Sequence, residues 1–113
     1  MVAIETCRKI ALSYEGATAV PHFEKPSFRI NKKIFLTLDE KNKRAAVKLS
    51  PVEQSVFCVF DSAIIYPATG AWGKQGWTLI ELNSIKKELI RDAINSSYCN
   101  VAPRNLAEKY KSR

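Results

Sequence analysis

The fold is decided by residues 27–53, which read SFRINKKIFLTLDEKNKRAAVKLSPVE. Apolar and polar side chains alternate along three stretches of this segment, as they do in β-strands that bury one face. Asn31-Lys32 suits a tight turn between the first two stretches, because Asn tolerates positive φ, and the polar residues 40–43 supply the second turn. The segment therefore predicts a three-stranded antiparallel meander.

The alternation also separates an apolar face of the meander from a basic one. Successive side chains of a strand point to opposite sides, so the residues predicted to face the core are Ile34, Leu36, Leu38, Val47 and Leu49. The opposite face would carry Arg29, Lys33, Phe35, Arg44 and Lys48, with Trp77 from a later strand as a candidate to join it.

The end of the quoted segment predicts a helix start. In Ser50-Pro51-Val52-Glu53, Ser50 can cap the helix, Pro suits its first turn, and Glu53 can reach back to the Ser50 amide to complete a capping box. We expect this helix to run to about Phe60. Its predicted inward residues are Val52, Val56, Val59 and Phe60.

The rest of the chain predicts helices and further strands around the meander. A helical stripe runs through residues 2–15 at Ile4, Cys7, Ala11 and Tyr14, and the proline-containing residues 17–26 read as a loop. Short strands are expected at 64–67 and 77–82, a long helix capped by Asn83 or Ser84 up to about Asn100, and a last short helix from Pro103. The predicted fold class is α+β. Residues 1–113 form a single domain, in which an antiparallel β-sheet packs its apolar face against α-helices.

Composition excludes several classes of protein. The 113 residues contain no apolar run near the roughly 20 residues that span a bilayer, and no secretory signal is visible at the start of the chain. The three cysteines, Cys7, Cys58 and Cys99, are odd in number and form no C-x-x-C pair, so we expect buried, reduced thiols. The expected location is the cytoplasm, with no membrane association.

Catalytic and metal-binding motifs are missing from the sequence. His22 is the single histidine, which excludes a multi-histidine metal site within one chain. Residues 70–76 (GAWGKQG) are not a phosphate-binding P-loop, because Gly70 and Gly73 are too close together and Gln75 stands where Ser or Thr would ligate Mg²⁺. They read as a turn whose glycines let Trp72 and Trp77 pack at its ends. We expect no enzyme activity, no catalytic residue, no cofactor and no metal.

Charge is the most informative functional signal. Lys and Arg outnumber Asp and Glu by 18 to 11, a net charge of +7, and residues 28–49 alone hold seven basic and two acidic residues. Cations interleaved with an aromatic side chain on an open sheet suit phosphate contact and base stacking. The alternative interpretation is a solvated face on which Lys and Arg stems cover Phe35.

Several segments together resemble the MmcQ/YjbR family of small bacterial proteins. They are residues 25–30 (KPSFRI) with 33–35 (KIF), 48–54 (KLSPVEQ), 72–77 (WGKQGW), 97–98 (SY) and 101–104 (VAPR), in order along nearly the whole chain. Lys25 stands where many members carry His. The resemblance implies a CyaY-like, double-wing arrangement of helices against an antiparallel sheet, and members are commonly described as predicted DNA-binding proteins. The matching positions include Arg29, Lys33, Trp72, Gly73, Lys74, Gly76, Trp77 and Pro103.

Two functions follow as expectations. The leading one is nucleic-acid binding, to DNA rather than RNA, by a monomer that uses Arg29, Lys33, Phe35, Arg44, Lys48, Lys74 and Gln75, with Gln75 as a candidate base-reading residue. The alternative is a protein-interaction or small-ligand-binding module centred on Trp72, Gly73, Gly76 and Trp77.

Overall fold

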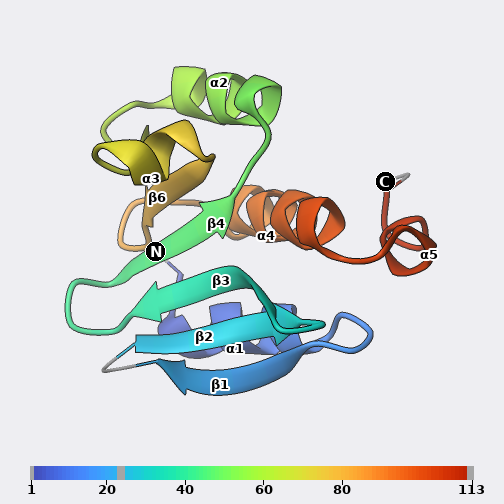
Figure 1. The fold of residues 1–113 in the computed structure, drawn as a ribbon. Helices are drawn as coiled ribbons and strands as arrows, with labels where there is room; N and C mark the ends of the chain where they lie inside the picture. Colours follow the sequence, from blue (N-terminus) through green and yellow to red (C-terminus); the bar gives the residue numbers. More distant parts are fainter. Residues whose placement is uncertain (1, 23–24, 112–113) are drawn as a thin grey trace.

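The predicted meander forms and is the centre of a larger sheet (Figure 1). A computed structural model describes residues 2–22 and 25–111. Strands β2 (Lys25–Ile30), β3 (Lys33–Asp39) and β4 (Arg44–Lys48) are successive antiparallel neighbours. Asn31 and Lys32 both have positive φ, 51° and 69°, as a two-residue hairpin turn that matches the strand twist requires.

Three more strands extend the meander on both sides. They are β1 (Thr18–His22), β5 (Ile65–Pro67) and β6 (Trp77–Glu81), and the sheet order is β1-β2-β3-β4-β6-β5 with every pair antiparallel. The prediction of a loop over residues 17–26 is therefore wrong for residues 18–22 and 25–26, where β1 pairs with β2, while residues 23–24 lie outside the described part of the chain. Pro21 is compatible with β1 because this strand lies at the edge of the sheet, where a missing amide hydrogen removes little pairing.

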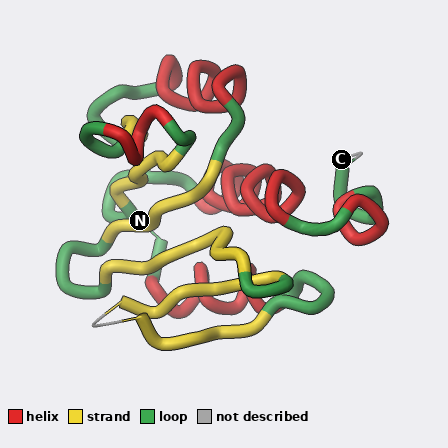
Figure 2. Tube along the Cα trace, viewed as in Figure 1, coloured by secondary structure: helices red, strands yellow, loops and turns green. Residues whose placement is uncertain are grey.

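The described residues form five helices: α1 (Ile4–Leu12), α2 (Pro51–Phe60), α3 (Ala71–Lys74), α4 (Lys87–Val101) and α5 (Arg104–Ala107). Of these, α1 and α4 cover one face of the sheet, whereas α3 lies beside β5 and β6 with Trp72 toward the opposite face. Helix α4 packs against β3 and β4, and α1 lies beside α4. In the view of Figures 1 and 2, α1 runs behind β1 and β2, so the sheet face toward the reader is not covered by α1. An antiparallel sheet with helices against its apolar face confirms the predicted α+β class.

Helix α4 begins later than predicted. Its cap is Lys86, which makes no side-chain capping bond, while Asn83 and Ser84 lie in the preceding turn. Its buried stripe consists of Ile90, Ala93, Ile94, Ser97 and Tyr98. None of the helices among the described residues combines the length and the apolar character that a membrane span requires.

The buried face of the sheet matches the prediction at Leu36, Leu38 and Val47, which are fully buried, and departs from it at Ile34 and Phe35. A β-bulge shifts the register between β2 and β3, so that Arg29 pairs with Ile34 and Phe28 with Leu36. Phe35 is the extra residue, its side chain is 0% exposed, and its ring packs edge-on against Tyr98 at 5.3 Å between centroids. The prediction that Phe35 lies on the basic face is wrong, because the bulge turns it into the core.

The bulge coincides with a buried hydroxyl group between two strands. Ser97 of α4 accepts a hydrogen bond from the Lys48 amide (2.8 Å) and donates one to the Phe35 carbonyl (2.5 Å). The pairing of β3 with β4 stops one residue short of Phe35 and Lys48, at the pair Leu36 and Val47. Ser97 therefore satisfies the backbone groups of two strands at the point where their pairing stops.

Helix α2 has the predicted capping box but not the predicted inward face. Ser50 accepts from the Glu53 amide (3.2 Å) and Glu53 accepts from the Ser50 amide (2.9 Å). The predicted inward residues are instead exposed, by 63% to 85% of their surface: Val52, Val56, Val59 and Phe60. The half-buried residues Phe57 and Cys58 pack against the core in their place.

The three cysteines are free, as predicted. Cys7 is fully buried, and burial raises the pKa of its thiol to about 11. Cys58 and Cys99 are half-buried, and burial also raises their pKa values above the usual range. A raised pKa keeps each thiol protonated at neutral pH, so none of the three is an activated nucleophile.

Replacing Ser50 with Ala should lower the free energy of unfolding by about 1 kcal/mol, the usual effect of losing an N-cap. The measurement is the urea midpoint of unfolding. Ser55→Ala is the matched control, because Ser55 is an exposed residue in the middle of the same helix. Equal midpoints for the two variants would show that the box does not stabilise α2.

Ser97→Ala should lower the free energy of unfolding by about 2–4 kcal/mol, because it leaves two buried backbone groups without a partner. The control is Ser96→Ala, which removes a hydroxyl from the neighbouring, half-buried position of α4. Urea unfolding monitored by circular dichroism measures both. A Ser97→Ala protein as stable as the control would mean that the Lys48 amide and the Phe35 carbonyl find other partners without the hydroxyl group.

Candidate nucleic-acid interface

The sheet face turned away from α1 and α4 is called the open face here. The register places on it Arg29, Ile34, Thr37, Asp39, Arg44, Ala46, Lys48, Trp77, Leu79 and Glu81. All of these residues are half-buried. The open face is therefore partly exposed and carries cations, carboxylates and apolar side chains.

A groove of about 690 Å³ lies at the end of the open face where β3 and β4 part. It is called the basic groove, because three lysines line it: Lys32 from the β2–β3 turn, Lys33 from the start of β3 and Lys48 from β4. Gln75, Trp77 and Asn100 contribute further lining. The Lys48 ammonium lies 5.6 Å from the centroid of the Trp77 ring, within the range of a cation–π contact.

Basic residues dominate this groove electrostatically. Within residues 2–22 and 25–111, none of the five ion pairs involves Lys32, Lys33 or Lys48. Among the residues that the structure describes, no acidic side chain lines the groove. Three positive charges from two strands and a turn therefore remain available to an anionic ligand.

An apolar hollow of about 320 Å³ adjoins the basic groove. Its lining consists of Ile34, Ala46, Ala68, Trp72, Trp77 and Leu79, with Lys25 at its edge. Ile34 and Trp77 line both the hollow and the groove. Trp72 of α3 is 63% exposed, so its indole ring is accessible to a flat ligand.

The loop between the two tryptophans is held by close backbone packing. A Cβ atom on Gly73 would collide with the Ala68 carbonyl oxygen, and one on Gly76, whose φ is +105°, with the Leu49 carbonyl oxygen. The Gln54 amide of α2 donates to the Gly73 carbonyl (3.1 Å) and to the Thr78 hydroxyl (3.1 Å). The glycines thus have a packing role, and the turn predicted for residues 70–76 contains the short helix α3.

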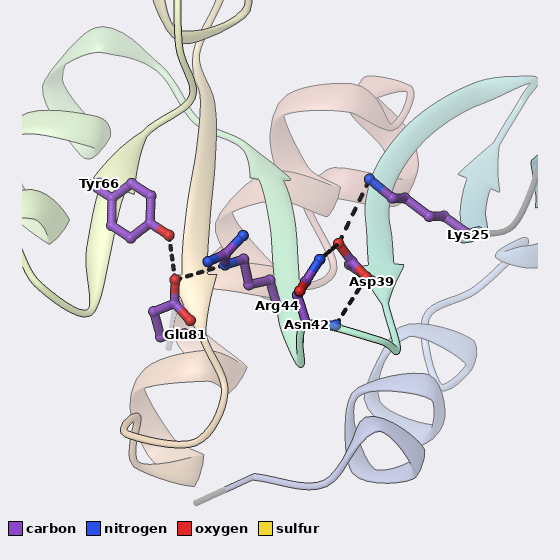
Figure 3. A network of polar contacts seen from close by, with 6 residues as sticks. All are labelled: Lys25, Asp39, Asn42, Arg44, Tyr66 and Glu81. Atoms are coloured by element: carbon purple, nitrogen blue, oxygen red, sulfur yellow. Dashed lines mark hydrogen bonds and ion pairs between the residues drawn. The ribbon is translucent and has the colours of Figure 1, made fainter.

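Figure 3 shows the opposite end of the open face, where charges pair with one another. Glu81 accepts hydrogen bonds from Arg44 (2.8 Å) and from the Tyr66 hydroxyl group. Asp39 accepts from the Asn42 side chain (2.9 Å) and lies 3.7 Å from the Lys25 ammonium.

These contacts stabilise the charged forms of both carboxylates. The hydrogen bond from Tyr66, followed by that from Arg44, lowers the pKa of Glu81 below its usual range. The hydrogen bond from the Asn42 side chain does the same for the pKa of Asp39. This end of the face carries balanced charge, and Arg44 is engaged by Glu81.

The structure therefore brings together only part of the predicted site. Lys33, Lys48, Gln75 and Trp77 line the basic groove. Arg29 lies on the open face with its Nε 3.3 Å from the Ser27 hydroxyl, and Lys74 is exposed at the end of α3. Arg44 lies in the paired network at the other end, and Phe35 is in the core.

Sequence reasoning missed Lys32 and Asn100 as groove residues. Lys32 was assigned to the turn alone, although its position beside Lys33 was visible in the sequence. Asn100 donates to the Lys48 carbonyl (3.1 Å) and to Glu53 (2.7 Å), contacts across about fifty residues that no local pattern indicates. Across the described part of the chain, no group of three His, Cys, Asp or Glu residues could hold a metal ion.

The fold is that of an α+β domain already seen in a solved structure. The crystal structure of Deinococcus radiodurans protein DR2400, which carries a domain of the DUF419 type, superposes with a TM-score of 0.80 at 15% sequence identity. The likeness covers 98% of this chain and 86% of that chain. At this identity it shows the fold and not a function.

The family is shown by the sequence itself. The YjbR family model matches residues 12–100, most of the chain. This protein belongs to the YjbR family, which confirms the resemblance noted from the sequence. No curated protein sequence matched the chain.

Gly76→Ala should lower the free energy of unfolding by about 1–3 kcal/mol through its positive φ alone, and further through the collision with Leu49. Gly70→Ala is the matched control, because Gly70 also has positive φ (+65°) but nothing lies within 4 Å of an added Cβ. Urea midpoints of the two variants separate backbone strain from collision. If the Gly70 variant were the less stable one, close packing at Gly76 would not hold the loop.

Proposed function

We propose that this protein binds DNA through the basic groove and the adjoining apolar hollow of its open face. The observation that carries the proposal is the set of three lysines, Lys32, Lys33 and Lys48, which line one groove with no acidic residue among its described lining. The nearby Glu53 is engaged by Ser50 and Asn100. Phosphate groups are the ligands that such a set attracts, because neutralising each phosphate releases counterions from the nucleic acid.

Aromatic side chains next to the lysines favour contact with bases as well. Trp77 lies under the Lys48 ammonium, and the exposed Trp72 lines the hollow beside it. In proteins that bind single strands, a cationic track follows the backbone while aromatic rings stack on the bases. Trp72 and Trp77, and not the buried Phe35, are therefore the aromatic residues on which bases would stack. Gln75 is the groove residue whose amide can pair with a base edge.

The binding surface covers less of the open face than the sequence suggested. Arg44 is held by Glu81, and a phosphate would have to compete with that carboxylate. Lys32, Lys33 and Lys48 are therefore the principal phosphate contacts in this proposal, with Arg29 and Lys74 as secondary ones.

A small-ligand site in the apolar hollow is the second candidate. The observation in its favour is that six of the eight lining residues are apolar aliphatic or aromatic, with Lys25 and Thr37 the exceptions. A neutral aromatic ligand held there would bind with little dependence on salt. Salt dependence therefore separates the two candidates.

Lys33→Gln/Lys48→Gln should weaken DNA binding at low salt and flatten the log–log salt dependence by about two units, since each phosphate contact contributes about −0.9 on duplex DNA. Lys9→Gln/Lys41→Gln is the control, because it removes the same charge from exposed residues outside the groove. Fluorescence anisotropy with labelled duplex and single-stranded DNA at several salt concentrations measures both. A parent protein that binds neither DNA at low salt would refute the proposal.

Trp72→Ala should weaken binding to single strands by about 1–3 kcal/mol and affect duplex DNA less, because stacking needs an unpaired base. The chain has two tryptophans, and both border the proposed site. Quenching of intrinsic fluorescence on addition of single-stranded DNA therefore reports the contact directly. Quenching of Trp77 should persist in the Trp72→Ala variant, and its absence would place the DNA elsewhere.

A further inference from the structure

Helix α2 exposes an apolar stripe to solvent. Val52, Val56, Val59 and Phe60 follow one another at helical spacing, and each is at least 63% exposed. Four large apolar side chains in one continuous row exceed the scattered exposure that is normal for a monomeric surface. Their exposure is not explained by the core, because Phe57 and Cys58 already fill the inward side of the helix.

The stripe leads into a groove of about 540 Å³ between the end of α2 and the start of α4. The floor of this groove is apolar and includes Phe60, Ile64 and Leu89. Its rim carries three carboxylates, Asp61, Glu88 and Asp92, and one lysine, Lys86. The groove and the stripe share Phe60, so together they form one surface, called the α2 surface here.

The rim carboxylates form no ion pair with any described residue, in contrast to half of the described carboxylates. Within residues 2–22 and 25–111, five carboxylates form ion pairs, namely Glu5, Glu15, Asp39, Glu81 and Glu108. Asp61, Glu88 and Asp92 form none there. Three unpaired acidic side chains thus gather around one apolar groove in a chain whose net charge is +7.

Apart from Lys86 on the groove rim, positive charge is absent from the part of this surface that α2 and its flanking residues form. None of the 18 Lys and Arg residues lies between positions 49 and 73, and this stretch contains all of α2 together with Glu53 and Asp61. The last turn of α2 holds no basic residue either. The α2 surface is therefore apolar and acidic on an otherwise basic protein.

We propose that the α2 surface docks a cationic amphipathic helix of a partner protein. The apolar side of such a helix would lie on Val56, Val59 and Phe60 and enter the groove, as helices do in other hydrophobic grooves. Its Lys or Arg residues would pair with Asp61, Glu88 and Asp92. A second copy of this chain fits less well, because a two-fold contact through α2 would bring two sets of these carboxylates together.

The probe is a fluorescein-labelled helical peptide of Leu and Lys, about 14 residues or roughly four turns long. The net charge of +7 disfavours nonspecific binding of this cationic peptide elsewhere on the protein, and the variants below locate the site. Fluorescence anisotropy should show saturable binding that weakens as salt is added. A peptide with the same composition but no apolar face, and one with Glu in place of Lys, should not bind.

Protein variants locate the binding. Val56→Ser/Val59→Ser should weaken it roughly tenfold or more, as expected for central apolar contacts. Glu88→Gln/Asp92→Asn should weaken it roughly threefold to tenfold and flatten its salt dependence. Leu12→Ser is the matched control, since Leu12 is an exposed apolar residue on α1, and it should leave binding unchanged. All three changes are at exposed positions, and urea midpoints verify that the variants fold.

Two results would overturn the proposal. One is a parent protein that does not bind the amphipathic peptide, or variants that all bind it equally well. The other is sedimentation that shows a dimer of the parent which Val56→Ser/Val59→Ser abolishes, because this would assign the stripe to a second copy of the chain. DNA binding by the same variant should be unchanged, so the test does not depend on the basic groove.

Discussion

The hydroxyl group of Ser97 is the interaction on which the shape of the sheet depends. It lies between β3 and β4, where it accepts a hydrogen bond from the Lys48 amide and donates one to the Phe35 carbonyl. A continuous ladder would pair such backbone groups with each other, so the hydroxyl replaces strand pairing at this point. The bulge at Phe35 follows in the same place. Phe35 joins the buried aromatic cluster with Tyr14 and Tyr98, and Ile34 turns to the open face.

The parting of β3 and β4 also explains why the two ends of the open face differ in charge. Where the strands stay paired, Asp39 is opposite Arg44, and Arg44 is opposite Glu81, so charges of opposite sign are direct neighbours. Cross-strand neighbours of this kind stabilise each other. Where the strands part, neither Lys33 nor Lys48 has a carboxylate opposite it: their ladder partners are Ile30 and Trp77, and both lysines border the groove. The free positive charge of the face is therefore concentrated at one end by strand register, and not by composition alone.

Most of the fold could be predicted from sequence patterns that are local in the chain. The strand alternation, the Asn31-Lys32 turn and the Ser50–Glu53 capping box each involve residues a few positions apart, and all three are present. The errors at the candidate site come from contacts across long distances in the chain, whereas the missed strand β1 pairs locally with β2. Ser97 acts on Phe35 from 62 residues away, and Glu81 engages Arg44 from 37 residues away. The inward side of α2 was misassigned because its valine stripe is the more hydrophobic one, whereas Gln54 faces inward to hold the Gly73 loop. The spacing of apolar residues does not indicate that a polar amide, that of Gln54, is needed on the inward side of α2.

Helix α2 connects the two surfaces, and its ends differ in how their charge is balanced. At its first turn, Ser50 and Glu53 satisfy the backbone amides, and the Glu53 carboxylate complements the partial positive charge of the helix. At its last turn, Asp61 follows directly, and a carboxylate there adds to the partial negative charge of the terminal carbonyl groups. No basic residue of α2 lies in this last turn, and the adjoining groove is lined by Glu88 and Asp92 with a single lysine, Lys86. A cationic ligand at this end would relieve both the helix terminus and the rim carboxylates, whereas the balanced first turn needs no such partner. The charge arrangement of one helix thus points toward a cation at its C-terminal end and leaves anion binding to the lysines of the groove.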